Sequence, residues 1–198
     1  MPKNICILYT ETNGLHKLDE PVSKKNSFGF ARLICLNYII GYRKDGQFKE
    51  LKKVRNILKP KCINYDKNAI KFHKIKQEKA AKKGFENTKV IKDFANDLKN
   101  VKIIVSHNLP FHIRSIQVEL FKTCTYINFD NYILIDTINF FHKFNFLKLR
   151  ELANKVLGKN FENKKPKYNT NIIRDIFLKL YNDYEKEIKK NQQISIKN

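Results

Sequence analysis

The sequence predicts an α/β protein with a mixed five-stranded sheet flanked by helices. Three strand-like segments come first, and helix-like segments then alternate with two further short apolar strands. A chain of 198 residues without internal repeats or a clear boundary suits one domain. We therefore expect residues 1–190 to form a single domain and residues 191–198 to form a basic C-terminal tail.

The first three strands are expected in the N-terminal third of the chain. Residues 4–10 are short and apolar, and residues 30–42 are rich in β-branched and aromatic side chains. Lys44, Asp45 and Gly46 form a hairpin signal. Residues 47–58 should therefore return antiparallel as an edge strand, which Lys59 and Pro60 end.

The remaining elements follow from apolar spacing and end signals. We expect helices over residues 68–72, 77–82, 88–98, 109–124, 147–157 and 169 to about 189, and strands over residues 101–105 and 132–135. Asp136 and Thr137 are typical of the start of a helix that runs to His142. Gly158 is typical of the residue that follows a helix end.

The charge of the chain is strongly unbalanced. Forty Lys and Arg against nineteen Asp and Glu give a net charge of +21. Such a charge opposes compaction and favours a polyanionic partner, of which nucleic acid is the leading candidate. An AT-rich genome is an alternative explanation, because Lys, Asn, Ile, Phe and Tyr all have A/T-rich codons.

Other sequence features exclude several classes of protein. No apolar run is long enough to span a membrane, and no secretory signal precedes the first strand. Cys6, Cys35, Cys62 and Cys124 lack zinc-site spacing and are expected to be reduced thiols. We expect an intracellular protein without a membrane partner, in a cytoplasmic, organellar or viral compartment.

Five segments in order carry a resemblance to a known family. They are residues 7–15 (ILYTETNGL), 68–75 (NAIKFHKI), 106–112 (SHNLPFH), 135–137 (IDT) and 168–180 (YNTNIIRDIFLKL). Together they resemble the motifs of the DnaQ-like (DEDDh) 3′–5′ exonucleases, and the likeness covers roughly residues 4–182. This resemblance implies the ribonuclease-H-like fold of that family.

The chemistry of this family uses four carboxylates around two divalent metals, together with a general base, usually His. The resemblance places Tyr9, Glu11, His112 and Asn169 at the carboxylate positions and Lys164 at the base. Glu11 is the only matched metal ligand, so we expect a catalytically degenerate member without a metal cofactor.

Two rearrangements of the site stay open at this stage. Asp175 could replace Asn169 in a shifted register, although it lies about 240° further round the helix. Glu11, His112 and Asp136 could together bind a softer metal such as Mn²⁺.

The resemblance and the charge together indicate where nucleic acid could bind. The candidate contact residues are Thr12, Asn13, Gly14, His73, His107, Phe111, Lys164, Lys165 and Lys167. Two of these also have structural interpretations, His107 as a hydrogen-bonding strand end and His73 as a packing residue.

Three functions follow. The first is a nuclease-dead exonuclease fold that binds nucleic acid, preferably a single strand or a 3′ end, through a basic groove. The second is a structural subunit of a replication, transcription, ribonucleoprotein or virion assembly. The third is an active 3′–5′ exonuclease with an atypical Mg²⁺ or Mn²⁺ site.

Overall fold

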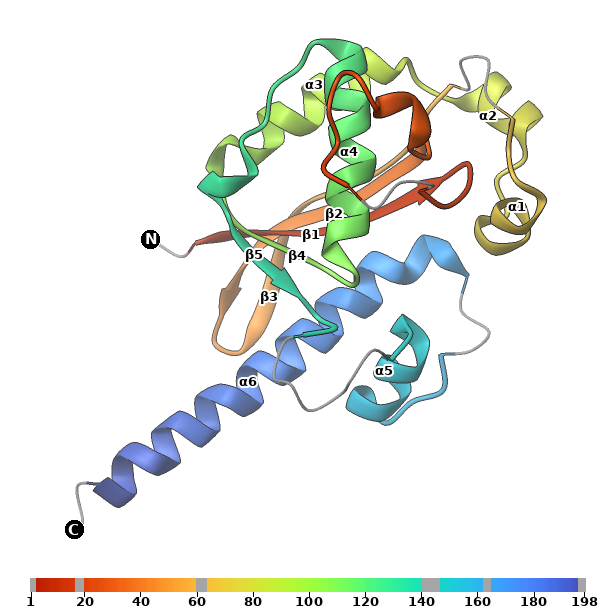
Figure 1. Cartoon of the computed structure of the whole chain (residues 1–198). Helices are drawn as coiled ribbons and strands as arrows, with labels where there is room; N and C mark the ends of the chain where they lie inside the picture. Colours follow the sequence, from red (N-terminus) through yellow and green to blue (C-terminus); the bar gives the residue numbers. More distant parts are fainter. Residues whose placement is uncertain (1–2, 17–19, 60–63, 140–146, 162–164, 196–198) are drawn as a thin grey trace.

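A five-stranded mixed sheet lies between two layers of helices (Figure 1). The computed structural model describes residues 3–16, 20–59, 64–139, 147–161 and 165–195, with side chains described as far as Asp183. The strand order is β3-β2-β1-β4-β5, and all five strands fall where the sequence predicts them. The predicted fold class is confirmed.

The first strand of the chain forms the centre of the sheet. β1 (Asn4–Thr12) pairs antiparallel with β2 (Leu33–Lys44) and parallel with β4 (Val101–Ser106). β3 (Gln47–Ile57) and β5 (Ile133–Asp136) form the two edges. Because β1 and β4 are parallel, the end of β1 and the end of β4 lie at the same side of the sheet.

The turn between β2 and β3 has the geometry that the sequence predicts. Asp45 and Gly46 both have positive φ angles, +51° and +72°. Two such residues form the tight turn whose twist matches that of the flanking strands, and Asp-Gly tolerates it best. β3 therefore returns as the expected edge strand.

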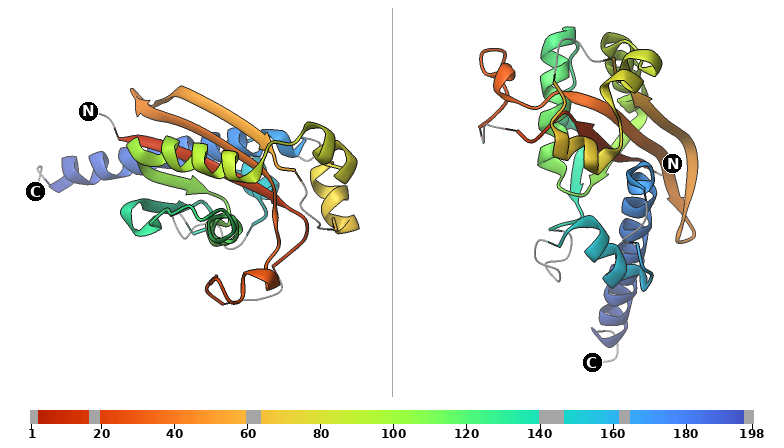
Figure 2. Two further views of the ribbon diagram at one scale, coloured as in Figure 1. Left: turned by 90° about the horizontal axis from the view of Figure 1, so that it is seen from above. Right: turned by 90° about the vertical axis from the view of Figure 1, so that its right-hand side faces the viewer.

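Side chains that alternate between the two faces of the sheet form two separate hydrophobic cores. One face packs against α3 (Asn87–Asp97) and α4 (Leu109–Thr123), and the other packs against α5 (Leu149–Leu157) and α6 (Asn169–Ser195). Cys6 and Leu8 of β1 point to the first core, and Ile5, Ile7 and Tyr9 point to the second. Figure 2 shows the two helical layers on either side of the sheet.

Two short helices lie beyond the end of β1. α1 (Lys67–His73) and α2 (Gln77–Lys83) lie together at one side of the molecule (Figure 1). The Asp66 carboxylate accepts hydrogen bonds from the backbone N–H groups of Asn68 and Ala69, which caps α1. The backbone N–H of Asp66 donates to the Asn13 carbonyl at 2.8 Å, so α1 is held next to the end of β1.

Four 3₁₀ turns complete the described structure. They are η1 (Ser27–Gly29), η2 (Leu98–Asn100), η3 (Phe129–Asn131) and η4 (Pro166–Tyr168). No helix in the described part of the chain is long and apolar enough to cross a lipid bilayer.

The helix predicted to start at Asp136 and Thr137 is wrong in the part that the structure describes. Residues 137–139 form a turn rather than the start of a helix, and residues 140–146 lie outside the described residues. The Asp136 carboxylate does accept a backbone hydrogen bond from Ile138, but it also accepts bonds from Asn108 and Leu109. Asp136 therefore caps the start of α4, a partner that local sequence does not reveal.

The ends of other elements differ slightly from expectation. β2 begins at Leu33 rather than at Phe30, and α6 continues to Ser195. Residues 196–198 of the predicted tail lie outside the described residues. The division into one domain and a tail stays a prediction.

Candidate functional site

The end of β1 gathers the family-matched positions that the structure describes. Tyr9 and Glu11 are two residues apart on one strand and therefore share a face of the sheet. The Tyr9 ring contacts the His112 ring with centroids 4.7 Å apart, and the Tyr9 hydroxyl is hydrogen-bonded to the Asn169 side chain. The structure thus brings His112 and Asn169 to Tyr9, two residues before Glu11, while Lys164 lies outside the described residues.

The imidazole of His112 is fully engaged by the protein. Its Nδ1 accepts a hydrogen bond from the Thr10 backbone N–H at 3.1 Å and lies 2.7 Å from the Thr10 hydroxyl. Its Nε2 lies 3.1 Å from the His107 carbonyl, to which it donates because Nδ1 is the acceptor. Burial lowers the pKa of His112 to about 3, so the ring is neutral and neither nitrogen is available to a metal.

Glu11 is a nearly isolated buried acid. Its side chain is only 5% exposed, and within the described part of the chain its carboxyl makes neither a hydrogen bond nor an ion pair. Burial raises its pKa to about 8, although the positive charges of Arg55 and Arg150 act in the opposite direction. At neutral pH the group is therefore largely protonated.

Arg150 and Asn169 connect α5 to the start of α6. The Arg150 guanidinium donates to the Asn169 Oδ1 at 3.2 Å and to the Phe161 carbonyl at 2.6 Å. Burial raises the pKa of the Tyr9 hydroxyl, which stays protonated beside Asn169. A phenol, a neutral imidazole and an amide thus stand at three positions where the family resemblance calls for carboxylates, and the Arg150 cation bonds the amide.

The alternative metal sites are not assembled. Both oxygens of Asp136 accept backbone hydrogen bonds, so Asp136 cannot join Glu11 and His112 without uncapping α4. Asp175 is part-exposed and paired with Arg174 at 2.7 Å. No group of three His, Cys, Asp or Glu residues that could hold a metal occurs among the residues described. This donor set does not fit a two-metal centre.

The first candidate contact residues hold the local architecture at the end of β1. The Thr12 hydroxyl donates to the Gly14 carbonyl at 2.6 Å. The Asn13 amide donates to the Asn64 carbonyl at 3.0 Å and accepts from the Arg32 N–H at 2.6 Å. These bonds fix the segment next to α1, and whether it also contacts nucleic acid stays a prediction.

His73, His107 and Phe111 have structural partners. Nδ1 of buried His73 accepts from the Ile75 N–H at 3.0 Å, and burial lowers the pKa of His73 to about 4. Nδ1 of His107 lies 2.9 Å from the Thr137 hydroxyl, in agreement with the strand-end interpretation. The half-buried Phe111 ring packs against the His16 ring, with centroids 4.6 Å apart.

The lysines of η4 lie on an exposed surface that α1 shares. Lys165 and Lys167 are exposed, and the Lys167 ammonium lies 5.0 Å from the centroid of the Tyr168 ring. α1 packs beside η4 and adds exposed lysines and the 58% exposed ring of Phe72. We call this the α1–η4 surface, and it comprises Lys67, Lys71, Phe72, Lys74, Lys165, Lys167 and Tyr168.

Sequence reasoning missed Arg55 and Arg150. Neither lies in a segment that resembles the family. Arg55 reaches the site through the pairing of β3 with β2, and Arg150 reaches it through the packing of α5 on α6. Only three-dimensional contacts bring the two arginines to Glu11, so no local spacing could have identified them.

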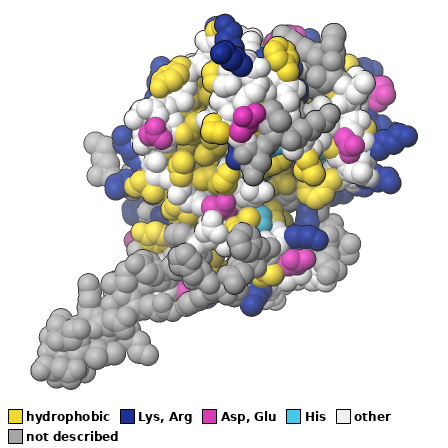
Figure 3. Space-filling view, viewed as in Figure 1, with side chains coloured by type: hydrophobic (Ala, Val, Ile, Leu, Met, Phe, Trp, Pro, Cys, Tyr) yellow, Lys and Arg dark blue, Asp and Glu magenta, His cyan; other side chains and the backbone are white. Residues whose placement is uncertain are grey.

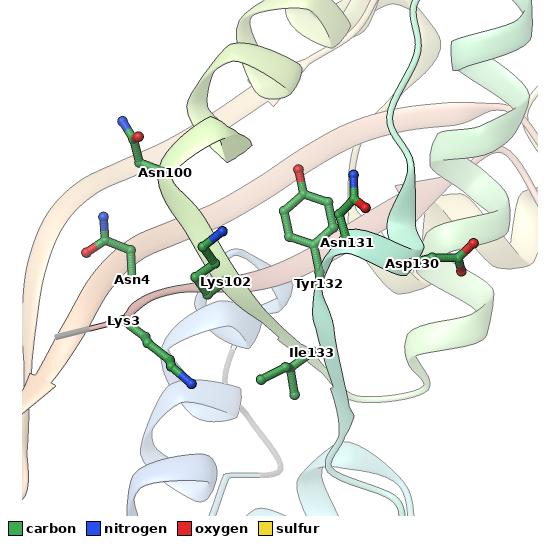
Figure 4. Close-up of a pocket in the computed structure, with 8 residues that line it drawn as sticks. All are labelled: Lys3, Asn4, Asn100, Lys102, Asp130, Asn131, Tyr132 and Ile133. Atoms are coloured by element: carbon green, nitrogen blue, oxygen red, sulfur yellow. The ribbon is translucent and has the colours of Figure 1, made fainter. Parts of the chain in front are cut away.

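A surface pocket lies at the opposite end of the sheet. It surrounds the starts of β1, β4 and β5 and has a volume of about 790 Å³. Figure 4 shows Lys3, Lys102, Tyr132 and Ile133 among the side chains that line it. Because β1 and β4 start here, the pocket is separated from Glu11 by the length of the sheet, and it is not part of the candidate site.

Comparison with known proteins identifies the fold. No protein-family model and no curated protein matches the sequence. The chain does match solved structures of exonucleases, and together with the strand order this gives it the ribonuclease-H-like exonuclease fold.

Three of these structures illustrate the likeness. Product-bound exonuclease I matches with a TM-score of 0.68 and 11% identity over 89% of this chain and 42% of that chain. E. coli exonuclease I in complex with a dA16 oligonucleotide matches with a TM-score of 0.68 and 12% identity over 90% of this chain and 40% of that chain. A 3′-exonuclease that recognises the 3′ end of a histone mRNA stem-loop matches with a TM-score of 0.69 and 13% identity over 92% and 64%.

The lengths of the matched chains differ from that of this protein. It spans about two fifths of each exonuclease I chain (42% and 40%) and just under two thirds (64%) of the histone mRNA exonuclease chain. At these identities the likeness concerns the fold.

Proposed function

We propose that the protein is a nuclease-inactive member of the exonuclease fold that binds nucleic acid beside the former catalytic centre. One observation carries the proposal. Of the four described positions that resemble the family's carboxylate ligands, only Glu11 is acidic, and two arginines act on its charge. Two divalent cations require concentrated negative charge, and this site offers the reverse.

The α1–η4 surface supplies the binding contacts in this proposal. Its lysines can contact phosphates without regard to sequence, and its exposed Phe72 and Tyr168 rings can stack on unpaired bases. Asn13 and Asp66 hold α1 next to the end of β1, so this surface adjoins the candidate site. In the view of Figure 3, Lys and Arg side chains follow the right-hand edge, where α1 and α2 lie.

The solved structures with this fold add support of a general kind. One is in complex with a single-stranded oligonucleotide, and another recognises a 3′ end of RNA. We extend this class of ligand to the present chain and expect a single strand or a 3′ end to bind more tightly than a duplex.

A degradation assay tests the proposal. Single-stranded DNA and RNA labelled at the 5′ end are incubated with the protein in Mg²⁺ and then in Mn²⁺, beside a Glu11→Ala control. We expect intact substrate that is retarded on a native gel. A ladder that shortens from the 3′ end, and that the Glu11→Ala variant does not produce, would instead indicate an active exonuclease with an atypical site.

A second candidate function is a structural subunit that uses the fold to contact protein. The edge strand β5 favours it, because Ile133 is 52% exposed and Leu134 is 42% exposed. Apolar side chains gather over this part of the molecule in Figure 3. An edge strand that exposes apolar side chains often marks a protein interface. Intact substrate without any gel retardation would favour this function over nucleic-acid binding.

A further inference from the structure

Hydrogen-bond donors surround the single buried acid of the candidate site. Arg150 is fixed by its bonds to the Phe161 carbonyl and Asn169, and the protonated hydroxyl of Tyr9 lies on the same side. Arg55 completes the set from the edge strand. A site that binds metal cations has the opposite arrangement, with many acceptors and few donors.

The sheet register aligns Arg55 with this site. Tyr9 pairs with Asn37, and Asn37 pairs with Arg55, so the three residues form one row across β1, β2 and β3. Paired residues share a face of a sheet, so Arg55 projects to the same side as Tyr9 and Glu11. Arg55 is exposed, and among the residues described no hydrogen bond or ion pair engages its guanidinium.

The Glu11 carboxyl has no hydrogen-bond partner within the described part of the chain, which leaves it open to a ligand. The side chain is 5% exposed, and within the described chain its carboxyl oxygens meet solvent rather than a hydrogen-bond donor of the protein. A ligand whose anionic oxygens reach both arginines and Glu11 would engage all three side chains at once.

A phosphate monoester has this combination of groups. It has three terminal oxygens, so two can accept from the planar forks of two guanidinium groups while the third shares a proton with Glu11. An internal phosphodiester has only two terminal oxygens.

We infer that Arg55, Arg150 and Glu11 form a subsite for the terminal phosphate monoester of a polynucleotide, at its 3′ end. This inference rests on the proposed function, because the polarity of the bound strand comes from it. The subsite distinguishes a 3′ phosphate from the 3′ hydroxyl that an exonuclease would require.

The test compares oligonucleotides that differ only at their ends. Internally labelled dT15 with a 3′ hydroxyl, a 3′ phosphate or a 5′ phosphate is titrated by fluorescence anisotropy at constant salt. We expect the 3′-phosphorylated form to bind about tenfold more tightly than the other two. The 5′-phosphorylated form carries the same total charge and therefore controls for general electrostatic attraction.

Single substitutions test which residues cause the preference for the 3′ phosphate. Two single variants, Arg150→Gln and Arg55→Gln, should each lower the affinity advantage of the 3′-phosphorylated strand from about tenfold to about twofold or less. Arg55→Gln removes a surface side chain and keeps the test valid if Arg150→Gln does not fold. Arg43→Gln is the matched control. Arg43 donates to the side chain of Asn182 in α6 at 2.8 Å, just as Arg150 donates to Asn169 of the same helix, but Arg43 lies near the β2–β3 turn and away from Glu11. It should keep the full preference.

The possible failures are distinguishable. Equal binding of all three oligonucleotides, or a preference for the 5′ phosphate, would overturn the subsite and leave the proposed function in place. Absence of binding by every oligonucleotide would overturn the proposed function itself. Inorganic phosphate that binds as tightly as the 3′-phosphorylated strand would reveal a site for a free anion and contradict the inference.

Discussion

Glu119 of α4 shows how single residues hold this basic chain together. Its fully buried carboxylate accepts two bonds from the Arg32 guanidinium, at 2.7 and 3.0 Å. It also accepts bonds from the Leu33 N–H at 3.3 Å and the Asn87 amide at 3.1 Å. A buried charge is tolerated when its hydrogen-bonding capacity is met in this way.

Loss of Glu119 should strongly destabilise the protein. We expect Glu119→Ala to lower the free energy of unfolding by about 3–5 kcal/mol, because the half-buried Arg32 guanidinium, the Leu33 N–H and the Asn87 amide would lose their shared acceptor. Urea denaturation measures the change. The matched control is Asp93→Ala, which breaks the exposed Lys89–Asp93 pair and should cost under about 1 kcal/mol. Similar losses in the two variants would contradict the role of Glu119.

Glu11 should make stability depend on pH. Its pKa rises from an ordinary value near 4.5 to about 8 on folding, so the folded protein binds more protons than the unfolded chain between these values. Stability due to this group is therefore lost as pH rises from about 5 to 9. At about 1.4 kcal/mol per pKa unit, the loss is of the order of 4 kcal/mol.

Glu11→Gln should remove this part of the pH dependence. We expect the variant to be about as stable as the wild type at pH 5 and more stable at pH 9, as measured by urea midpoints. Exposed Glu20 supplies the control, since Glu20→Gln should follow the wild-type curve. A Glu11→Gln curve parallel to the wild type would mean that the folded protein does not disfavour the Glu11 charge.

Among the elements, the helix ends follow general rules of backbone geometry. α5 ends at Leu157, and the next residue, Gly158, adopts a φ of +64° and donates its N–H to the Asn154 carbonyl at 3.1 Å. Nothing lies within 4 Å of the position that a Cβ atom would take there. The backbone conformation is therefore the only reason that this position favours glycine.

Gly158→Ala isolates that conformational cost. We expect a loss of about 1 kcal/mol in the free energy of unfolding, because an L-residue is strained at this φ. Gly14→Ala is the control, since a Cβ at Gly14 would meet only the Asp66 Cβ, at 3.6 Å, with no positive φ. A thermal melt that shows equal losses for both variants would contradict this explanation.

Local signals explain which elements were predictable. The Asp45–Gly46 turn and the αL residue Gly158 act through their own backbone, so the sequence alone predicts them. Asp136 has the same local signal of a helix start, yet its carboxylate mainly serves α4, whose first residues lie 27–28 positions earlier. Motif order similarly placed Tyr9, Glu11, His112 and Asn169 in one predicted site, whereas Arg55 and Arg150 depend on packing between distant elements.

At the scale of the whole molecule, the net charge of +21 should control binding. Each phosphate contact releases condensed counterions, so affinity for a single strand falls with salt at a slope of about −0.7 per contact. Lysines on the α1–η4 surface should contribute to that slope, and lysines elsewhere should not.

A double charge reversal tests this expectation. We expect Lys165→Glu with Lys167→Glu to weaken binding of dT15 at least tenfold and to make the salt dependence shallower, by loss of about two phosphate contacts. Lys99→Glu with Lys102→Glu makes the same charge change at the start of β4, the opposite end of the sheet. Equal weakening by both pairs would place the contacts outside the α1–η4 surface.

The central position of β1 also sets the order in which the chain can fold during synthesis. β2 and β3 are joined by a two-residue turn and can pair as soon as both have left the ribosome. One side of β1 can pair with β2 at that stage, but its other side can pair only after β4 has been synthesised, because Ile5 pairs with Ile103. A nascent chain that ends before residue 101 therefore leaves one side of β1 unpaired, which makes that interval of translation the one most prone to aggregation.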